Sequence, residues 1–397
     1  MTALTLASTP IIDSDSHAVE PVDLWTSRMP KKWLDQAPRV EWDERAGESR
    51  WRVGDVYLSG VGEYCSAGWR EPFPSHPPTL DEADPACWKA TERAAKLDSW
   101  GVHSQVLYPN VIAFDTHVFM THLDPEVALA CVQAYNDFLT DFSAEAPNRF
   151  IPIMMLPVWD VDASVQEMKR CRERGHKGVL FAALLDRIGL PHISDERYVP
   201  ILNTAQDLEM SLNFHLGVGV RTADDLVAGW NMRTKTALAQ RTNRLSFVKK
   251  TSLSFVSSIE AMADVILRGI CEQYPRLKFV SVESGFGYWP YILEHMDWLW
   301  ASSGSREEFS GRLLPSEYWR RQFYCTFWHE RETLKLLPDF ADNVMFETDY
   351  PHETCLAAQG YTAREAAKRS LENVSQEVAE KVLFRNAAKL YGIDVAQ

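Results

Sequence analysis

The chain has 397 residues, 46% hydrophobic and 24% charged, which is typical of a globular protein with one large domain or two ordinary ones. A formal net charge of −14 argues against nucleic-acid binding and against binding to anionic membranes, because both need a basic surface. No apolar stretch is long enough to span a bilayer, and the N-terminal MTALTLASTP lacks the basic residues of a signal peptide.

Short apolar runs alternate with longer amphipathic segments along the chain. The predicted strands are residues 10–17, 103–109, 149–157, 177–182, 211–216, 278–285, 322–328 and 344–351. The predicted helices are residues 124–146, 162–175, 197–209, 257–275, 288–300 and 332–341, with one or two more in 364–392. A strand followed by a helix about eight times predicts a single (β/α)8 TIM-barrel domain over residues 1–397. An open doubly wound sheet is the alternative, but no G-x-G-x-x-G follows the first strand.

Two regions depart from this repeat. Residues 18–90 are too long for one connection, and within them residues 40–58 alternate like a hairpin. We predict an insertion over the barrel mouth, after strand one. Residues 217–255 are predicted to be a long polar loop after strand five. Its basic residues are expected on a solvated face, where one of them could bind a carboxylate: Arg221, Arg233, Arg241, Arg244, Lys249 and Lys250.

The cysteines argue for a reducing compartment. They number seven and form no C-x-x-C pair, which is not the pattern of a disulfide scaffold or a structural zinc knuckle. We therefore predict a cytoplasmic location.

Polar residues collect at the carboxyl ends of the predicted strands, the end that carries the active site in a barrel. They are Asp15, His17, His215, Glu283, Asp349 and His352. Asp15 and His17 are two apart on a strand, so their side chains point the same way and reach one ion. Carboxylates with imidazoles suit zinc, manganese or iron, whereas calcium and magnesium prefer oxygen alone.

Each of these residues also has a plainer interpretation. Asp15 and His17 could cap a helix, although no clean helix start follows them. His215 alone would fit a buried core histidine, and Glu283 could cap the helix that opens at Tyr288. His352 could be an exposed turn residue. Their repetition at strand ends favours a metal site.

The motifs, taken in this order, closely resemble those of the amidohydrolase-related family. They are Asp-x-His at the end of strand one, then FHLG, ESGFGYWP, ETDYPH and the closing KVLFRNAAKLYGI. The family includes the aminocarboxymuconate semialdehyde decarboxylase group, and the resemblance covers nearly the whole chain. It implies a metal-bearing barrel and suggests a homodimer.

The resemblance also implies a set of metal ligands: Asp15, His17, His215 and Asp349. Two positions differ from the usual family pattern. Asp15 replaces the first histidine of the usual His-x-His, as in a sub-branch with Asp-x-His or Glu-x-His. Glu283 replaces the strand-six histidine that is often the acid or base. We expect a divalent ion, zinc first and manganese or iron as alternatives.

Other residues are assigned with less support from the pattern. Asp13 is predicted to orient a metal-bound histidine from outside the ligand set, or else to be a buried polar residue. His295 is expected on a helix surface or interface, and His329 beside a pocket or at a helix cap. Aromatic residues of the insertion are candidates for an apolar pocket: Trp51, Tyr57, Tyr64 and Trp69.

The leading functional hypothesis is a metal-dependent hydrolase or non-oxidative decarboxylase of a small organic acid or ring compound. Asp349 would accept a proton from water in the first reaction, or protonate the carbon left by carbon dioxide in the second. Glu283 and His352 are the other candidate catalytic residues. A second hypothesis is a dinuclear iron or manganese oxygenase, with Glu283 bridging and His295 or His352 on the second ion. A third is a catalytically silent partner subunit.

Overall fold

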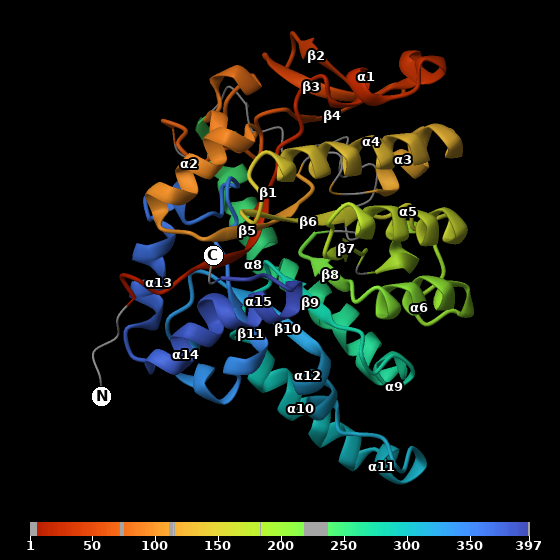
Figure 1. Cartoon of the computed structure of the whole chain (residues 1–397), viewed down its shortest axis with the longest axis vertical. Helices are drawn as coiled ribbons and strands as arrows, with labels where there is room; N and C mark the ends of the chain where they lie inside the picture. The colour runs from red at the N-terminus through yellow and green to blue at the C-terminus, as the bar shows by residue number, and fades with distance from the viewer. Residues whose placement is uncertain are drawn as a thin grey trace.

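Eight parallel strands form a nearly closed barrel with helices around it (Figure 1). The computed structural model describes residues 6–71, 75–110, 114, 116–182, 184–217 and 237–395. The barrel strands follow each other in chain order: β1 (Ile12–His17), β5 (Ser104–Tyr108), β6 (Phe150–Met155), β7 (Gly178–Leu180), β8 (Ser211–His215), β9 (Phe279–Val282), β10 (Phe323–Phe327) and β11 (Val344–Phe346). This confirms the predicted (β/α)8 TIM barrel. All six residues of β6 are buried, as expected for a strand covered on both faces.

The barrel closes between its first and last strands. Ser16 forms a parallel bridge with Tyr350, and the His17 backbone nitrogen donates to the Tyr350 carbonyl oxygen at 2.7 Å. The Asp349 nitrogen donates to the Asp15 carbonyl oxygen at 3.0 Å. This seam brings the segment 13–17 against the segment 348–352, which are more than 300 residues apart in the sequence.

Helices lie outside the strands. They are α1 (Leu24–Arg28), α2 (Ala90–Trp100), α3 (His117–His122), α4 (Pro125–Ala144), α5 (Val161–Glu173), α6 (Val199–Asp207), α8 (Ala237–Leu267), α9 (Ile270–Gln273), α10 (Trp289–Ser302), α11 (Ser305–Glu308), α12 (Pro315–Gln322), α13 (Ala363–Leu371), α14 (Gln376–Glu380) and α15 (Asn386–Tyr391). Proline at the first position of α4 has no N–H to leave unpaired, which favours a helix start there. The predicted helix 332–341 is instead a 3-10 helix, Thr333–Asp339, with Pro338 inside it.

The insertion after β1 carries a three-stranded antiparallel sheet, which stands apart from the barrel strands at the top of Figure 1. Its strands are β2 (Arg39–Asp43), β3 (Glu48–Val53) and β4 (Val56–Gly60). The Ala67 nitrogen donates to the Pro351 carbonyl oxygen at 3.1 Å, next to the barrel seam. The insertion therefore contacts the end of the barrel where the predicted site lies.

The predicted loop 217–255 is wrong over its second half, which is helical from Ala237 as part of α8. The apolar residues of this half are not confined to one stripe: Phe247 and Phe255 are partly buried, while Leu245 and Val248 are 63% and 58% exposed. This weak amphipathicity hides the helix in the sequence. Arg221, Arg233 and the Arg241 side chain lie outside the described residues, whereas Arg244, Lys249 and Lys250 are exposed.

One connected cluster of buried apolar residues runs through the barrel and into the insertion, where it includes Trp51, Val53 and Leu58. Within the described ranges, no helix has the length and apolar character needed to cross a membrane. All seven cysteines are buried free thiols.

Candidate metal centre and active site

The tip of β1 supplies two side chains to a buried centre. His17 lies with Nδ1 at 2.6 Å from the Pro109 carbonyl oxygen. A carbonyl only accepts, so Nδ1 carries the hydrogen and Nε2 of the neutral ring presents a lone pair. That Nε2 lies 3.5 Å from Asp15 Oδ1 and 3.6 Å from Asp349 Oδ1. The tautomer is thus fixed by a backbone oxygen, as is common for metal-binding histidines.

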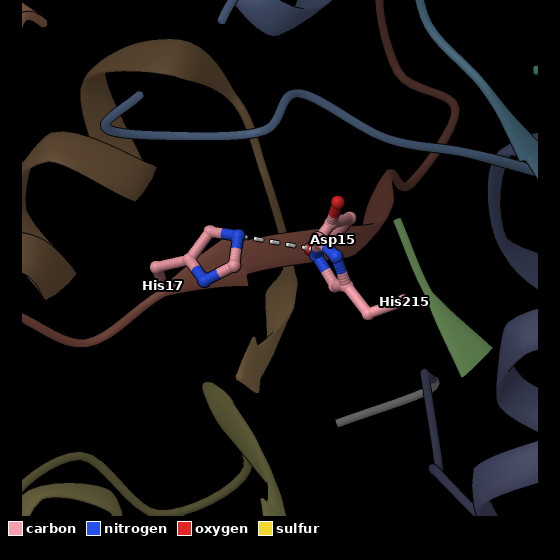
Figure 2. Close-up of side chains that lie close together, drawn as sticks. All are labelled: Asp15, His17 and His215. Atoms are coloured by element: carbon pink, nitrogen blue, oxygen red, sulfur yellow. Dashed lines mark hydrogen bonds and ion pairs between the residues drawn. The ribbon is translucent and has the colours of Figure 1, made fainter. Parts of the chain in front are cut away.

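His215, at the end of β8, repeats this arrangement. Its Nδ1 donates to the Leu216 carbonyl oxygen at 3.0 Å, and its Nε2 lies 3.2 Å from Asp15 Oδ1. The two imidazole rings are 5.0 Å apart between centroids. Figure 2 shows His17 and Asp15 on the same strand, β1, with the His17 ring turned toward Asp15, while His215 comes to Asp15 from β8. Burial lowers the pKa of His17 and of His215 to about 3, so both rings are neutral near pH 7.

These lone pairs face other acceptors, which is the main chemical feature of the centre. His17 Nε2 and Asp15 Oδ2 are buried without a hydrogen-bond partner among the described residues. Acceptors that face each other in a dry site are unfavourable unless a cation lies between them. Two imidazole nitrogens and carboxylate oxygens form a donor set that divalent transition metals bind. The residues present therefore fit a divalent ion.

Asp349 completes the centre from the segment after β11. Its backbone has a positive φ of 58°, a conformation that strains a non-glycine residue and is concentrated at functional sites. Burial raises its pKa, but the charge of His352 and the hydrogen bond from that residue outweigh this and hold the pKa below its usual range. Asp349 is therefore ionised near pH 7. This favours its predicted roles as ligand and base, and it argues against the predicted role as the acid that protonates carbon.

The pKa of Glu283 is shifted in the opposite direction to that of Asp349. It follows β9 with a positive φ of 52°, and its Oε2 lies 3.7 Å from His215 Nδ1. Burial and the charges of Asp349 and Asp15 raise its pKa well above the usual value. Glu283 is thus a candidate proton donor, and the two carboxyl groups are tuned in opposite directions.

His352 lies between the centre and the insertion. Its Nδ1 is 3.0 Å from Asp349 Oδ1, and its Nε2 is 2.7 Å from Asn110 Oδ1. Its ring stacks on that of His17, with centroids 3.8 Å apart. Burial lowers its pKa, but the charge of Asp349, a hydrogen bond to Asp349 and the charges of Glu353 and Asp15 together outweigh this, so the net shift of the pKa is upward.

Together these residues form three overlapping groups that have the geometry to hold a metal ion. Each group has one ligand atom per residue, all within 4.8 Å of one another, and every member is buried. The groups are Asp15 with His17 and His215, His17 with Asp349 and His352, and Asp15 with Glu283 and Asp349. All six residues singled out at the strand ends are thus brought together.

Other predicted residues lie elsewhere. Asp13 forms its hydrogen bonds away from the rings of His17 and His215. It accepts from Gln105 Nε2 at 2.7 Å and from the Thr348 backbone nitrogen at 2.7 Å. It therefore fastens β1 to the seam instead of orienting a histidine. His295 is exposed and stacks on Tyr291, with centroids 5.6 Å apart, so it lies on a helix surface as expected.

Of the insertion aromatics, Tyr64 approaches the centre, 5.4 Å from His352 between ring centroids. The others have different surroundings. Trp51 packs on Trp25, Tyr57 donates to Glu41, and Trp69 donates to Ser75. Of these four aromatic residues, Tyr64 is the one that lies beside the centre, and the pocket itself stays a prediction.

Sequence reasoning missed Thr354. Its hydroxyl hydrogen-bonds to Asp349 Oδ2 and lies 3.3 Å from Glu283 Oε1, so it joins the two carboxyl groups. It also missed Glu347, whose spacing of two from Asp349 was an available signal; Glu347 Oε2 accepts from the Glu283 nitrogen at 3.3 Å. Asn110, just past β5, carried no comparable signal.

The sequence matches the family described as Amidohydrolase over residues 12–393. The chain belongs to the amidohydrolase family. This amidohydrolase is 23% identical over 378 residues to a 2-amino-3-carboxymuconate-6-semialdehyde decarboxylase of Dictyostelium discoideum, covering 94% of this chain and 92% of the relative. The family and this relative identify the chain as an enzyme, a carboxy-lyase or a hydrolase.

Solved structures share the fold of this amidohydrolase. An amidohydrolase from Mycobacterium avium subsp. paratuberculosis K-10 superposes with a TM-score of 0.73 at 18% identity, covering 99% of this chain and 100% of the other. A dihydroxybenzoic acid decarboxylase from Polaromonas sp. JS666, with bound manganese and the inhibitor 2-nitroresorcinol, gives a TM-score of 0.60 at 18% identity, covering 98% of each chain.

Proposed function

We propose that this amidohydrolase is a metal-dependent, non-oxidative decarboxylase of an aromatic or cyclic acid. The observation that carries the proposal is the pair of neutral imidazoles whose Nε2 lone pairs face buried carboxylates, beside a glutamate with a raised pKa. The named activities of the Dictyostelium and Polaromonas proteins support decarboxylation over hydrolysis. The proposed functional unit is the whole chain, residues 1–397, as one barrel domain in the reducing cytoplasm.

Asp15, His17, His215 and Asp349 would hold the ion. A divalent ion there would supply Lewis acidity toward the substrate carboxylate and an adjacent ring oxygen. Its identity is proposed as manganese or zinc: imidazole and carboxylate donors suit both, and the Polaromonas decarboxylase is described with manganese.

Glu283 is the proposed proton donor. The bond between the ring carbon and the carboxylate breaks, carbon dioxide leaves, and the electron pair stays on the ring carbon. That carbon then takes the proton of the Glu283 carboxyl group, which regains one from solvent. His352, held between Asn110 and Asp349, would orient the carboxylate of Asp349.

The test is a screen of carboxylated aromatics for carbon dioxide release by the metal-loaded protein, with and without oxygen. The proposal predicts equal release under both conditions and stoichiometric formation of the ring product. Hydrolysis of an amide or ester without carbon dioxide release would instead support the hydrolase reading, in which ionised Asp349 accepts a proton from water.

A dinuclear oxygenase is the second candidate, favoured by the group of His17, Asp349 and His352 beside that of Asp15, Glu283 and Asp349. His295 is withdrawn from this candidate because it stacks at the surface on Tyr291. Two metal ions per chain and activity that requires oxygen would support the oxygenase.

We also propose a homodimer. Apolar side chains on α8 and α10 are exposed, with Val248 at 58%, Tyr291 at 65% and Trp298 at 71%. Tyr291 and Trp298 are seven residues apart and so lie on one face of α10. Exposed apolar surface of this kind is typical of an association face.

A further inference from the structure

A large cavity adjoins the metal centre, with a volume of about 840 Å³. Glu283 and Thr354 line it, and Thr354 hydrogen-bonds to Asp349, so one end of the cavity reaches the edge of the centre. Pockets of roughly 300–1,000 Å³ bind ligands as large as a typical drug. The cavity therefore has room for more than a one-ring acid.

Aromatic side chains form its walls. Phe255 of α8 stacks on Tyr288 with ring centroids 5.1 Å apart and planes at 27°. Trp328 lines the cavity from the segment after β10. Phe247, Thr251 and Phe255 recur at intervals of four, so one face of α8 is presented to the cavity. Half-buried rings of this kind bind a flat, apolar body.

A cation lies at the exposed part of the lining. Arg369 of α13 is exposed, donates through Nη1 to the Tyr361 hydroxyl at 2.6 Å, and lies 5.1 Å from the centroid of that ring. Among the described residues it forms no ion pair, whereas nearby Arg331 pairs with Glu372 at 3.5 Å. The chain carries a net charge of −14, so acidic residues are plentiful. An arginine that lines a cavity and forms no ion pair with any of the described ones is therefore available to bind an anionic ligand.

The acidic residues of the lining do not neutralise this cation. Glu330 accepts from the Phe286 and Trp328 backbone nitrogens at 2.7 and 3.1 Å, so its carboxylate is already held by the loops. Glu283 lies at the metal-centre end of the cavity, with Oε1 3.3 Å from the Thr354 hydroxyl and Oε2 3.7 Å from His215 Nδ1. Glu353 Oε2 is buried without a hydrogen-bond partner among the described residues, so it does not pair with Arg369. A guanidinium binds a carboxylate through two parallel hydrogen bonds, which gives it specificity for this group.

We propose that the substrate is an elongated aromatic diacid. Its reacting carboxylate lies at the metal centre, its flat body packs against the aromatic wall of Phe255, Tyr288 and Trp328, and a second, distal carboxylate binds Arg369. This inference rests on the proposed function for the reacting end of the substrate. It adds Arg369 as a residue that determines specificity through binding.

The test compares two probes on the metal-loaded full chain: biphenyl-4,4′-dicarboxylate and biphenyl-4-carboxylate. Calorimetry is expected to give about tenfold or tighter binding for the dicarboxylate, because a charge-assisted pair with Arg369 forms with it alone. Arg369→Gln should abolish this preference, and Arg369→Lys should retain part of it. Lys368→Gln is the matched control: it removes a positive charge from the same helix, outside the cavity lining, and should keep the preference.

Equal affinity of the wild type for the two probes, or an unchanged preference in Arg369→Gln, would overturn the inference. Because binding is measured without turnover, the outcome is separate from that of the proposed function. A dicarboxylate preference that depends on Arg369, in a protein that releases no carbon dioxide from any acid tested, would remove the decarboxylase proposal and leave the binding assignment in place.

Discussion

At the scale of single residues, the main feature of the centre is that Nε2 of both His17 and His215 is unprotonated. The carbonyl oxygens of Pro109 and Leu216 accept hydrogen bonds from Nδ1 of His17 and of His215, respectively. Each Nε2 is left as a base that faces Asp15. A cation relieves the resulting repulsion, which is why the loss of one carboxylate is expected to weaken metal binding.

Asp15→Asn should lower affinity for the divalent ion by at least about tenfold, because it removes one negative charge and one donor oxygen. The measurement is competitive metal titration with a chelator, followed by elemental analysis. Asp342→Asn, which changes an aspartate that pairs with Lys381 at 2.8 Å, is the control and should bind metal as the wild type does. Unchanged affinity in Asp15→Asn would remove Asp15 from the ligand set.

Thr354→Val should lower kcat by about tenfold while metal content stays constant. The hydroxyl that joins Asp349 to Glu283 is lost, so the two carboxyl groups are no longer held in one geometry. Steady-state kinetics over a range of pH is the measurement. Thr354→Ser keeps the hydroxyl and should recover most of the rate and the wild-type pH profile; equal loss in both variants would indicate a packing defect.

The sequence predicts those residues that lie at strand ends, since a barrel brings such ends together whatever the details of its loops. Asp15, His17 and His215 could be found in this way. Thr354 could not, because it lies in a turn after the last strand, and its direction depends on the barrel seam. The opposite pKa shifts of Asp349 and Glu283 could not be predicted either, because they follow from burial and from neighbours distant in sequence.

At the scale of secondary-structure elements, all eight strands were predictable because they are short segments separated by longer helical patterns. The first half of α8 was not, since its apolar residues are divided between the cavity wall and solvent. The hydrogen bonds of Asp13 across the seam were also hidden, because alternation in a strand reveals which face a side chain occupies but not its partner.

The packing of α4 and α5 gives a stability prediction through His176, which lies 3.0 Å from the Thr140 hydroxyl. Burial lowers the pKa of His176 from 6.5 to about 4. Below pH 6.5 the unfolded chain binds a proton that the folded protein does not accept until about pH 4. His176 therefore leaves the free energy of unfolding unaffected above pH 6.5. As the pH falls from 6.5 to 4, it lowers the free energy of unfolding by about 3 kcal/mol in total.

Urea unfolding at pH 7.5, 6.0 and 5.0 checks this prediction. Other groups titrate in the same interval, so the informative quantity is the difference in slope between the wild type and His176→Gln. The variant should lose less free energy of unfolding between pH 7.5 and 5.0 than the wild type. Parallel pH profiles would show that His176 is not held neutral by its surroundings.

At the scale of the whole molecule, the barrel, its insertion and a long helix all contribute to one site. Tyr64 of the insertion reaches His352, and Phe255 of α8 reaches the cavity beside Glu283. The family and the barrel were predictable from the order of motifs along the chain. The cavity was not, because its walls come from connections whose lengths and directions the strand pattern leaves open.

Trp298→Glu should convert the proposed dimer to a monomer without unfolding it, since the side chain is 71% exposed. Sedimentation velocity at several concentrations is the measurement, with circular dichroism as the check on folding. Glu126→Gln, an exposed polar substitution on α4, is the control and should leave the assembly unchanged. A wild type that is monomeric at all concentrations would end the homodimer proposal.

The most direct test of the metal centre is anomalous diffraction from crystals of the full chain grown with manganese, and separately with zinc. We predict one strong peak in the barrel, at about 2.0–2.3 Å from donor atoms of Asp15, His17, His215 and Asp349. A map without a peak among these four side chains, or with the ion bound at another place, would contradict the account.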